Sequence, residues 1–168
     1  MSSTCQYDED EHFECADAGA ADTFPCAAGD LKRGDTVCIR GRPCKVLAVS
    51  CFKGGKHGHC KAAIEGEDIF TGRKHELVAP ASYPMPCPFV FKSEYQLIDI
   101  AADGRQLSLL DADCEQRGDL DLPLDGSFNE ATGRAIRAHF AAGKSLVLLA
   151  QRAMGIEAVM SFKVDNGR

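Results

Sequence analysis

Apolar and polar side chains alternate with a period of two between residues 23 and 91, as they do in half-buried β-strands. Glycine and proline interrupt this alternation at short intervals, where a chain turns between antiparallel strands. The pattern predicts a turn at residues 41–43 and strands at 36–40, 44–49, 61–64 and 75–78. Short strands separated by glycine turns, with no convincing helix between them, favour a small barrel.

The second half of the chain shows a different order of elements. Strands are predicted at residues 95–100, 106–110, 119–122, 146–150 and 157–164. The dipeptide Asp103-Gly104 marks a hairpin turn between the first two of them. A single helix is predicted before the last two strands. Three strands, a helix and two strands is the element order of the five-stranded OB-fold.

The predicted helix is defined by an apolar stripe and by its ends. Ser127 is followed three residues later by Glu130, which is the spacing of a capping box. Gly143 is suited to end the helix. The residues that recur at helical spacing between these ends are Phe128, Ala131, Ala135, Ile136 and Phe140.

Proline-rich residues 79–91 separate the two patterns. Proline fixes φ and removes a backbone donor, so this segment is interpreted as a stiff linker between domains. Its prolines are Pro80, Pro84, Pro86 and Pro88. The predicted protein is mainly β, with a barrel domain at residues 23–90 and a second domain at 91–168. Residues 1–22, rich in acids, Ala and Ser, are predicted to be an acidic disordered tail.

Charge is distributed unevenly along the chain. The net charge is −6, yet residues 24–91 carry ten Lys or Arg against six acids, whereas residues 1–23 carry seven acids and no Lys or Arg. A basic middle segment is a candidate surface for polyanions. No apolar run approaches the length of a membrane span, and the acidic N-terminus does not resemble a signal peptide. We therefore expect a cytoplasmic protein with no membrane partner.

Nine cysteines are spread over the chain in an odd number and without a C-x-x-C pair. This pattern does not predict a disulfide framework, and most of the thiols are expected to be reduced, small apolar residues. No cofactor is expected from these positions.

Residues 51–60, Cys-Phe-Lys-Gly-Gly-Lys-His-Gly-His-Cys, concentrate the candidate chemistry between two predicted strands. A phosphate-binding P-loop is excluded, because Ser50 replaces its first glycine and His57 its final Ser or Thr. A zinc site of Cys51, His57, His59 and Cys60 has the right ligand types. Adjacent strand residues point to opposite faces, however, and the spacing matches no common zinc finger. A Cys–His nucleophile lacks an orienting third group.

The remaining interpretation of this segment is an exposed hairpin tip. Its glycines permit positive φ and close approach of the backbone to another molecule. Its lysines and histidines can contact phosphates and bases. The residues assigned to this loop are Lys53, Gly54, Gly55, Lys56, His57, Gly58, His59 and Lys61. Residue types alone do not distinguish a binding loop from a merely soluble one.

The segment Gly55-Lys56-His57-Gly58-His59 resembles the hypusine loop of the eukaryotic translation initiation factor 5A family. Further similar segments occur in the family's order: Asp22–Pro25, Gly41–Lys45, Asp68–Gly72, Gln96–Ile98 and Leu107–Leu110. The resemblance covers about residues 22–165. It implies an N-terminal SH3-like barrel followed by a C-terminal OB-fold. The chain differs from the family at the tip, where Phe52-Lys53-Gly54 replaces Ser-Lys-Thr, and at Cys60, where a small residue is usual.

The resemblance also implies a function and its partners. By position, Lys56 is the residue that receives an aminobutyl group from spermidine through deoxyhypusine synthase, and deoxyhypusine hydroxylase completes hypusine. The modified factor is expected to bind the ribosome beside the P-site tRNA and to assist peptide-bond formation at stalling sequences such as proline runs, and also termination. It is an accessory factor and not itself an enzyme. The alternative is an RNA-binding SH3–OB protein that acts without hypusine.

Overall fold

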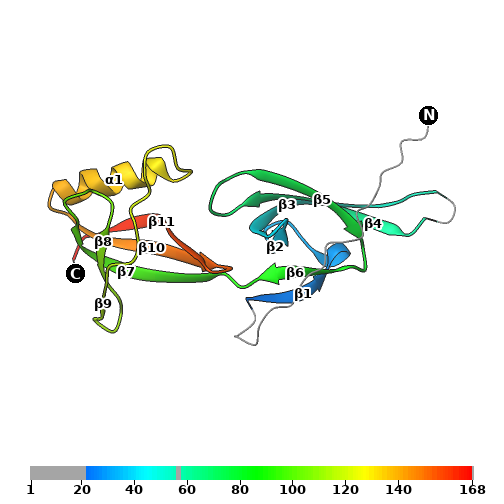
Figure 1. The fold of residues 1–168 in the computed structure, drawn as a ribbon, viewed down its shortest axis with the longest axis horizontal. Helices are drawn as coiled ribbons and strands as arrows, with labels where there is room; N and C mark the ends of the chain where they lie inside the picture. The colour runs from blue at the N-terminus through cyan, green and yellow to red at the C-terminus, as the bar shows by residue number, and fades with distance from the viewer. Residues whose placement is uncertain (1–21, 56–57, 168) are drawn as a thin grey trace.

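The computed structural model describes residues 22–55 and 58–167 of this protein. The predicted tail, except for Asp22, lies outside this part of the chain. Within it, the fold is mainly β with one helix, and the chain forms an elongated molecule with two β-rich bodies (Figure 1). The predicted fold class, an SH3-like barrel followed by an OB-fold, is confirmed. No helix among the described residues is both long and apolar enough to cross a membrane.

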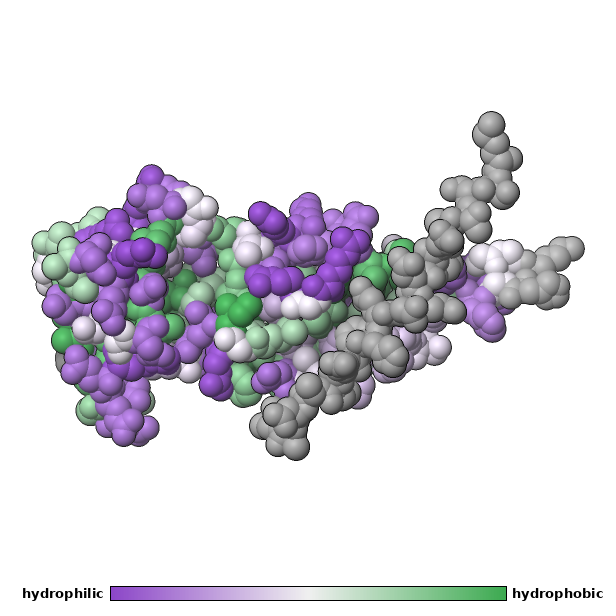
Figure 2. Space-filling view, viewed as in Figure 1, coloured by the Kyte–Doolittle hydropathy of each residue, from purple (hydrophilic) through white to green (hydrophobic). Residues whose placement is uncertain are grey.

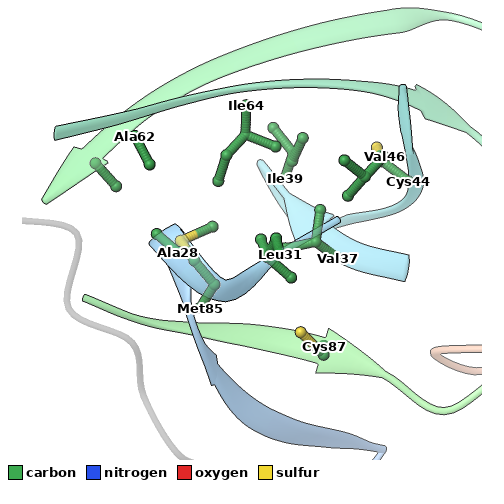
Figure 3. Close-up of a cluster of buried hydrophobic side chains, with 11 residues drawn as sticks. Ala28, Leu31, Val37, Ile39, Cys44, Val46, Ala62, Ile64, Met85 and Cys87 are labelled. Atoms are coloured by element: carbon green, nitrogen blue, oxygen red, sulfur yellow. The ribbon is translucent and has the colours of Figure 1, made fainter. Parts of the chain in front are cut away.

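The N-terminal body contains a four-stranded antiparallel sheet in the order β2-β3-β4-β5. These strands span Thr36–Ile39, Arg42–Lys53, Cys60–Asp68 and Lys74–Pro80. A two-stranded ribbon of β1 (Thr23–Ala27) and β6 (Pro84–Pro88) and a short 3₁₀ helix, η1 (Ala28–Asp30), cover its inner face. Side chains from both layers meet in one hydrophobic core, the first core (Figure 3). Alternating burial along β4 shows why the period of two identified these strands.

The turn between β2 and β3 lies earlier than the predicted 41–43. Arg40 and Gly41 both have positive φ, 52° and 74°, and Ile39 pairs directly with Arg42. This is a two-residue hairpin turn of the kind whose twist matches the flanking strands. Pro43 is therefore inside β3, opposite Cys38.

The prediction that residues 79–91 form a linker is wrong for most of its length. Residues 84–88 form β6, which pairs with β1 so that Pro25 stands opposite Pro86. Met85 and Cys87 alternate with the prolines and are buried in the first core. The prolines are tolerated because this ribbon has only two strands, so each strand leaves one side free of ladder hydrogen bonds.

The C-terminal body is a five-stranded sheet in the order β11-β10-β7-β8-β9. Its strands are β7 (Phe91–Ile100), β8 (Leu107–Leu110), β9 (Gln116–Arg117), β10 (Ser145–Ala153) and β11 (Ile156–Asp165). The predicted strand at 119–122 is wrong: the third strand is the two-residue β9, and only Asp121 forms an isolated bridge, with Gln106. The alternation there was nonetheless informative, because Leu120 and Leu122 are buried in the second core, which is the hydrophobic core of the C-terminal body.

Helix α1 (Glu130–Ala141) packs on this sheet, and its two ends differ in how well they were predicted. Ser127 does not cap it: its hydroxyl donates to the carbonyl of Leu124, and Asn129 is the residue before the helix. At the other end Gly143 has φ of 76°, and the N–H groups of Gly143 and Lys144 donate to the carbonyls of Phe140 and His139. This Schellman arrangement confirms that Gly143 ends the helix.

Phe128 precedes the helix and does not belong to its buried stripe. Its side chain is 55% exposed, and its ring lies against Gly72 in the turn between β4 and β5. A β-carbon at Gly72 would overlap the ring, so glycine allows this contact between the two bodies.

Asp68 at the end of β4 is a buried carboxylate, only 1% exposed. It accepts hydrogen bonds from the Arg42 guanidinium at 2.7 Å and from the backbone N–H groups of Phe70 and Thr71 at 2.8 and 3.2 Å. Burial raises the pKa of this carboxyl, but the hydrogen bonds lower it more, so the pKa lies below its usual value. The group therefore fixes the β4–β5 turn in its ionised form.

Asp68→Asn is expected to lower the free energy of unfolding by ~2 kcal/mol near neutral pH, because hydrogen bonds to a charged group are lost. A depressed folded-state pKa gives stability that is present above the unfolded pKa and is lost as the pH falls through the folded pKa. Urea unfolding at decreasing pH should therefore show the difference between wild type and variant shrinking only below about pH 4. Glu65→Gln, which removes the exposed 4.0 Å ion pair with Lys74, is the control and should change little.

Candidate functional site

Strands β3 and β4 form a hairpin that extends beyond the rest of the N-terminal body, at the end of the molecule away from the C-terminal sheet (Figure 1). The last pairs of the ladder are Phe52 with Lys61 and Lys53 with Cys60. Residues 54–59 therefore connect the strands. The two strands are long because alternation continues past the barrel core, from buried positions such as Val46 to exposed ones near the tip.

Side chains at the described end of this hairpin lie in solvent. Residues 51–55, His59 and Cys60 are exposed, and Phe52 is 46% exposed. At this end of the molecule, residues coloured purple or white, hydrophilic or of intermediate hydropathy, project from the surface in Figure 2. Lys53 forms no ion pair with any residue that the structure describes. A projecting end of this kind can enter a space that a barrel cannot.

Glycine is required at two described positions of the tip. Gly55 has φ of 67°, and the N–H of Gly58 approaches the carbonyl of Gly55 at 3.5 Å. A β-carbon at Gly58 would overlap the carbonyl group of Gly54, whereas one at Gly54 would meet nothing within 4 Å. The sequence predicted glycines for approach to another molecule. The structure shows that glycine at residue 58 first allows the two sides of the tip, at Gly54 and Gly58, to pack closely against each other.

The structure places most, but not all, of the loop residues assigned from the sequence. Lys53, Gly54, Gly55, Gly58, His59 and Lys61 are described, and they gather at the hairpin end. Lys56 and His57 lie outside the described residues. Lys61 is half-buried, beside the exposed Cys60.

The zinc site and the Cys–His nucleophile, the two alternatives that use cysteine, can be compared with the positions of the described residues. Among the described residues, no group of three His, Cys, Asp or Glu side chains could hold a metal ion. The zinc hypothesis also used His57, which lies outside them. Free thiols are present at all described cysteines: Cys26, Cys38, Cys44, Cys51, Cys60, Cys87 and Cys114.

Burial makes some of these thiols poor nucleophiles. It raises the pKa of Cys87 to about 12 and that of Cys44 to about 11. Both side chains belong to the first core. Their role is packing, as expected from the sequence.

Comparison with known proteins agrees with this architecture over both bodies. Residues 21–83 match the family described as translation initiation factor 5A-like, N-terminal, and residues 89–163 match eukaryotic elongation factor 5A hypusine, DNA-binding OB fold. The chain belongs to the translation initiation factor 5A family. Its relatives carry the names of translation factors, not of enzymes.

The relatives of this initiation factor 5A family member are similar over nearly their whole length. Eukaryotic translation initiation factor 5A-2 of Saccharomyces cerevisiae is 44% identical over 156 residues, which cover 93% of this chain and 95% of the yeast protein. Factor 5A-3 of Arabidopsis thaliana is 42% identical, with coverage of 93% and 96%. A solved family structure from Naegleria fowleri superposes with a TM-score of 0.79 at 41% identity, covering 85% of this chain and 99% of that one.

Proposed function

We propose that this protein is a hypusine-containing translation factor and that Lys56 is the modified residue. The observation that carries the proposal is the projecting β3–β4 hairpin, whose glycine-dependent tip bears the Gly-Lys-His-Gly-His sequence of the family. Lys56 follows Gly55, which has positive φ, and precedes Gly58, which tolerates no side chain. Gly55 and Gly58, the described residues that flank this segment, thus both belong to the end of the hairpin.

Two partner enzymes would make the modification. Deoxyhypusine synthase would form a bond between the Lys56 Nζ and the aminobutyl carbon of spermidine, with release of diaminopropane, so one C–N bond replaces another. Deoxyhypusine hydroxylase would then convert one C–H bond of the added chain to C–OH, with dioxygen as the oxidant and an external two-electron reductant that converts the second oxygen atom to water. The result is a longer side chain with a second basic nitrogen. No resident cofactor is required in this chain.

The modified side chain would act on the ribosome by position and charge. A slender cationic chain can reach phosphates and ribose hydroxyls beside the P-site tRNA where a strand backbone does not fit. Holding a slow donor in a productive geometry accelerates peptide-bond formation without new bond chemistry from the factor. We propose this action at stalling sequences such as proline runs and during termination, in the cytoplasm.

Mass spectrometry of protein purified from its native source tests the proposal. The expected result is that the peptide containing Lys56 carries the added mass of hypusine, whereas the peptide mass at Lys53 is unchanged. Lys56→Arg is expected to remain folded but to lose modification and relief of proline-run stalling, because arginine keeps the charge without an acceptor amine. Lys53→Arg is the matched control and should retain both.

An unmodified Lys56 in the native cell would contradict this function. If Lys56→Ala and Lys53→Ala weakened ribosome and free-RNA binding equally, with similar dependence on salt, the chain would instead act as a general RNA-binding module.

A further inference from the structure

Phe24 of β1 lies beside Phe89 and Phe91, which are distant from it in sequence, and the three rings form an exposed patch. Phe89 and Phe91 belong to the stretch where β6 leads into β7, a connection that Figure 1 shows between the two bodies. Phe24, Phe89 and Phe91 are 45%, 42% and 53% exposed. The ring centroids of Phe24 and Phe89 lie 5.0 Å apart, and those of Phe89 and Phe91 lie 6.5 Å apart. Clustered exposed aromatic rings are costly in water and mark contact surfaces. We define these three residues as the aromatic patch.

The aromatic patch borders an apolar groove of about 300 Å³. Its lining includes Phe24 and Phe89 of the patch together with Leu31, Cys26 and Cys87. Rings beside a groove can hold a further aromatic or aliphatic side chain in contact with both. The site therefore fits an apolar anchor.

The charges around the aromatic patch are nearly balanced. Arg152 pairs with Phe91 across β10 and β7, and its guanidinium lies 5.0 Å from the Phe91 ring centroid. Exposed Lys32 and Arg33 stand in sequence between the groove residues Leu31 and Asp35, while Asp22 and Asp35 are exposed acids on the same border. A single-stranded RNA needs a cationic path for its phosphates beside stacked bases. This border favours an occupant bound through apolar contact.

The chain itself supplies such an occupant at this location. The N–H of Phe89 donates to the carbonyl of Asp22 at 2.9 Å, so residues 1–21 join the described structure at the aromatic patch. Phe13 lies nine positions before Asp22 in the sequence, and nine residues reach up to ~30 Å when extended. Phe13 can therefore reach any of the three rings. A short tether also gives an effective concentration in the mM range, which compensates for a small contact area.

We propose that residues 1–21 fold back onto the aromatic patch and that Phe13 is the side chain that contacts it. The acids of this segment would then lie near Arg152, the cation that contacts the patch. Self-association through the patch is less well supported, since three half-exposed rings provide far less than the ~800 Å² per partner of a stable interface. The segment would shield the apolar junction of the two bodies and hold acidic residues there.

Photo-crosslinking in the full chain tests the proposal. With p-benzoylphenylalanine replacing Phe13, the monomer is expected to give intramolecular cross-links to peptides that contain Phe24, Phe89 or Phe91. The double change Phe89→Ser and Phe91→Ser should lower their yield several-fold. Ile98→Ser is the matched control, because Ile98 is 47% exposed on β7 outside the patch, and it should leave the yield unchanged.

Three other cross-linking outcomes would overturn the proposal. Cross-links spread evenly over both bodies would show that the segment does not dock. Cross-links confined to a dimer would identify a second copy as the occupant. If a uridine oligonucleotide bound the wild type and the Ile98→Ser control but not the double variant, and abolished the cross-links, the patch would be an RNA-stacking surface. Equal thermal unfolding of all variants would show that the fold is intact.

Discussion

Gly58→Ala is expected to abolish modification of Lys56 while leaving the stability of the barrel unchanged. A methyl group at residue 58 would overlap the backbone carbonyl of Gly54, so the tip must adopt another path. The overlapping atoms of Gly54 belong to the backbone, so they cannot move aside as the end of a flexible side chain could. A modifying enzyme that forms a bond at the Lys56 Nζ must hold the surrounding loop in one geometry, and small misplacements of a reacting atom cost orders of magnitude in rate.

Gly54→Ala provides a close comparison for this prediction. Both variants add one methyl group to the same loop, but a β-carbon at residue 54 meets nothing within 4 Å. Co-expression with the modifying enzymes, followed by mass spectrometry, should show wild-type occupancy of Lys56 in Gly54→Ala and none in Gly58→Ala. Thermal unfolding should be the same for both, because the tip is outside the hydrophobic core. Full modification of Gly58→Ala would refute the argument.

Alternation of burial explains which parts of this fold were predictable from the sequence. Along β4 every second residue is buried, so its pattern is local and can be read directly. In β6 the buried residues Met85 and Cys87 also alternate with prolines, but proline argued against a strand. Strand β6 forms because it pairs with β1, and a pairing between residues about sixty positions apart leaves no local signal.

The ends of α1 show the same difference between local and non-local causes. Gly143 was predictable, because positive φ after a helix is a property of the turn itself. Ser127 matched the spacing of a capping box, but its hydroxyl donates to the carbonyl of Leu124 in the preceding turn. Short polar side chains have such competing partners nearby, and their spacing does not choose among them.

The candidate loop could be found from its residue types, whereas the close packing within its tip could not. The sequence of 53–61 identified the segment, but the need for glycine at residue 58 arises from the approach of Gly54 and becomes visible only in three dimensions. The aromatic patch is hidden for a similar reason. Phe24 is distant in sequence from Phe89 and Phe91, and the antiparallel pairing of β1 with β6 brings the three rings together.

Gly133→Ala is expected to destabilise the C-terminal body by about 2–4 kcal/mol, contrary to the usual gain of about 1 kcal/mol when alanine replaces glycine within a helix. Gly133 is buried in the first turns of α1, and a β-carbon there would overlap the carbonyl oxygen of Pro123. That backbone belongs to the segment that carries Leu120 and Leu122 into the second core. Moving either the helix or this segment would open the core.

Ala131→Gly separates this steric cost from helix propensity. Ala131 is exposed in the same helix, so its replacement should cost only about 1 kcal/mol, through backbone entropy. Urea unfolding followed by circular dichroism at a helical wavelength reports on α1, the one helix of the described chain that is longer than a single turn. If Gly133→Ala proved more stable than the wild type, the Pro123 carbonyl could shift at no cost. The close approach of α1 to this segment would then contribute nothing to the stability of the domain.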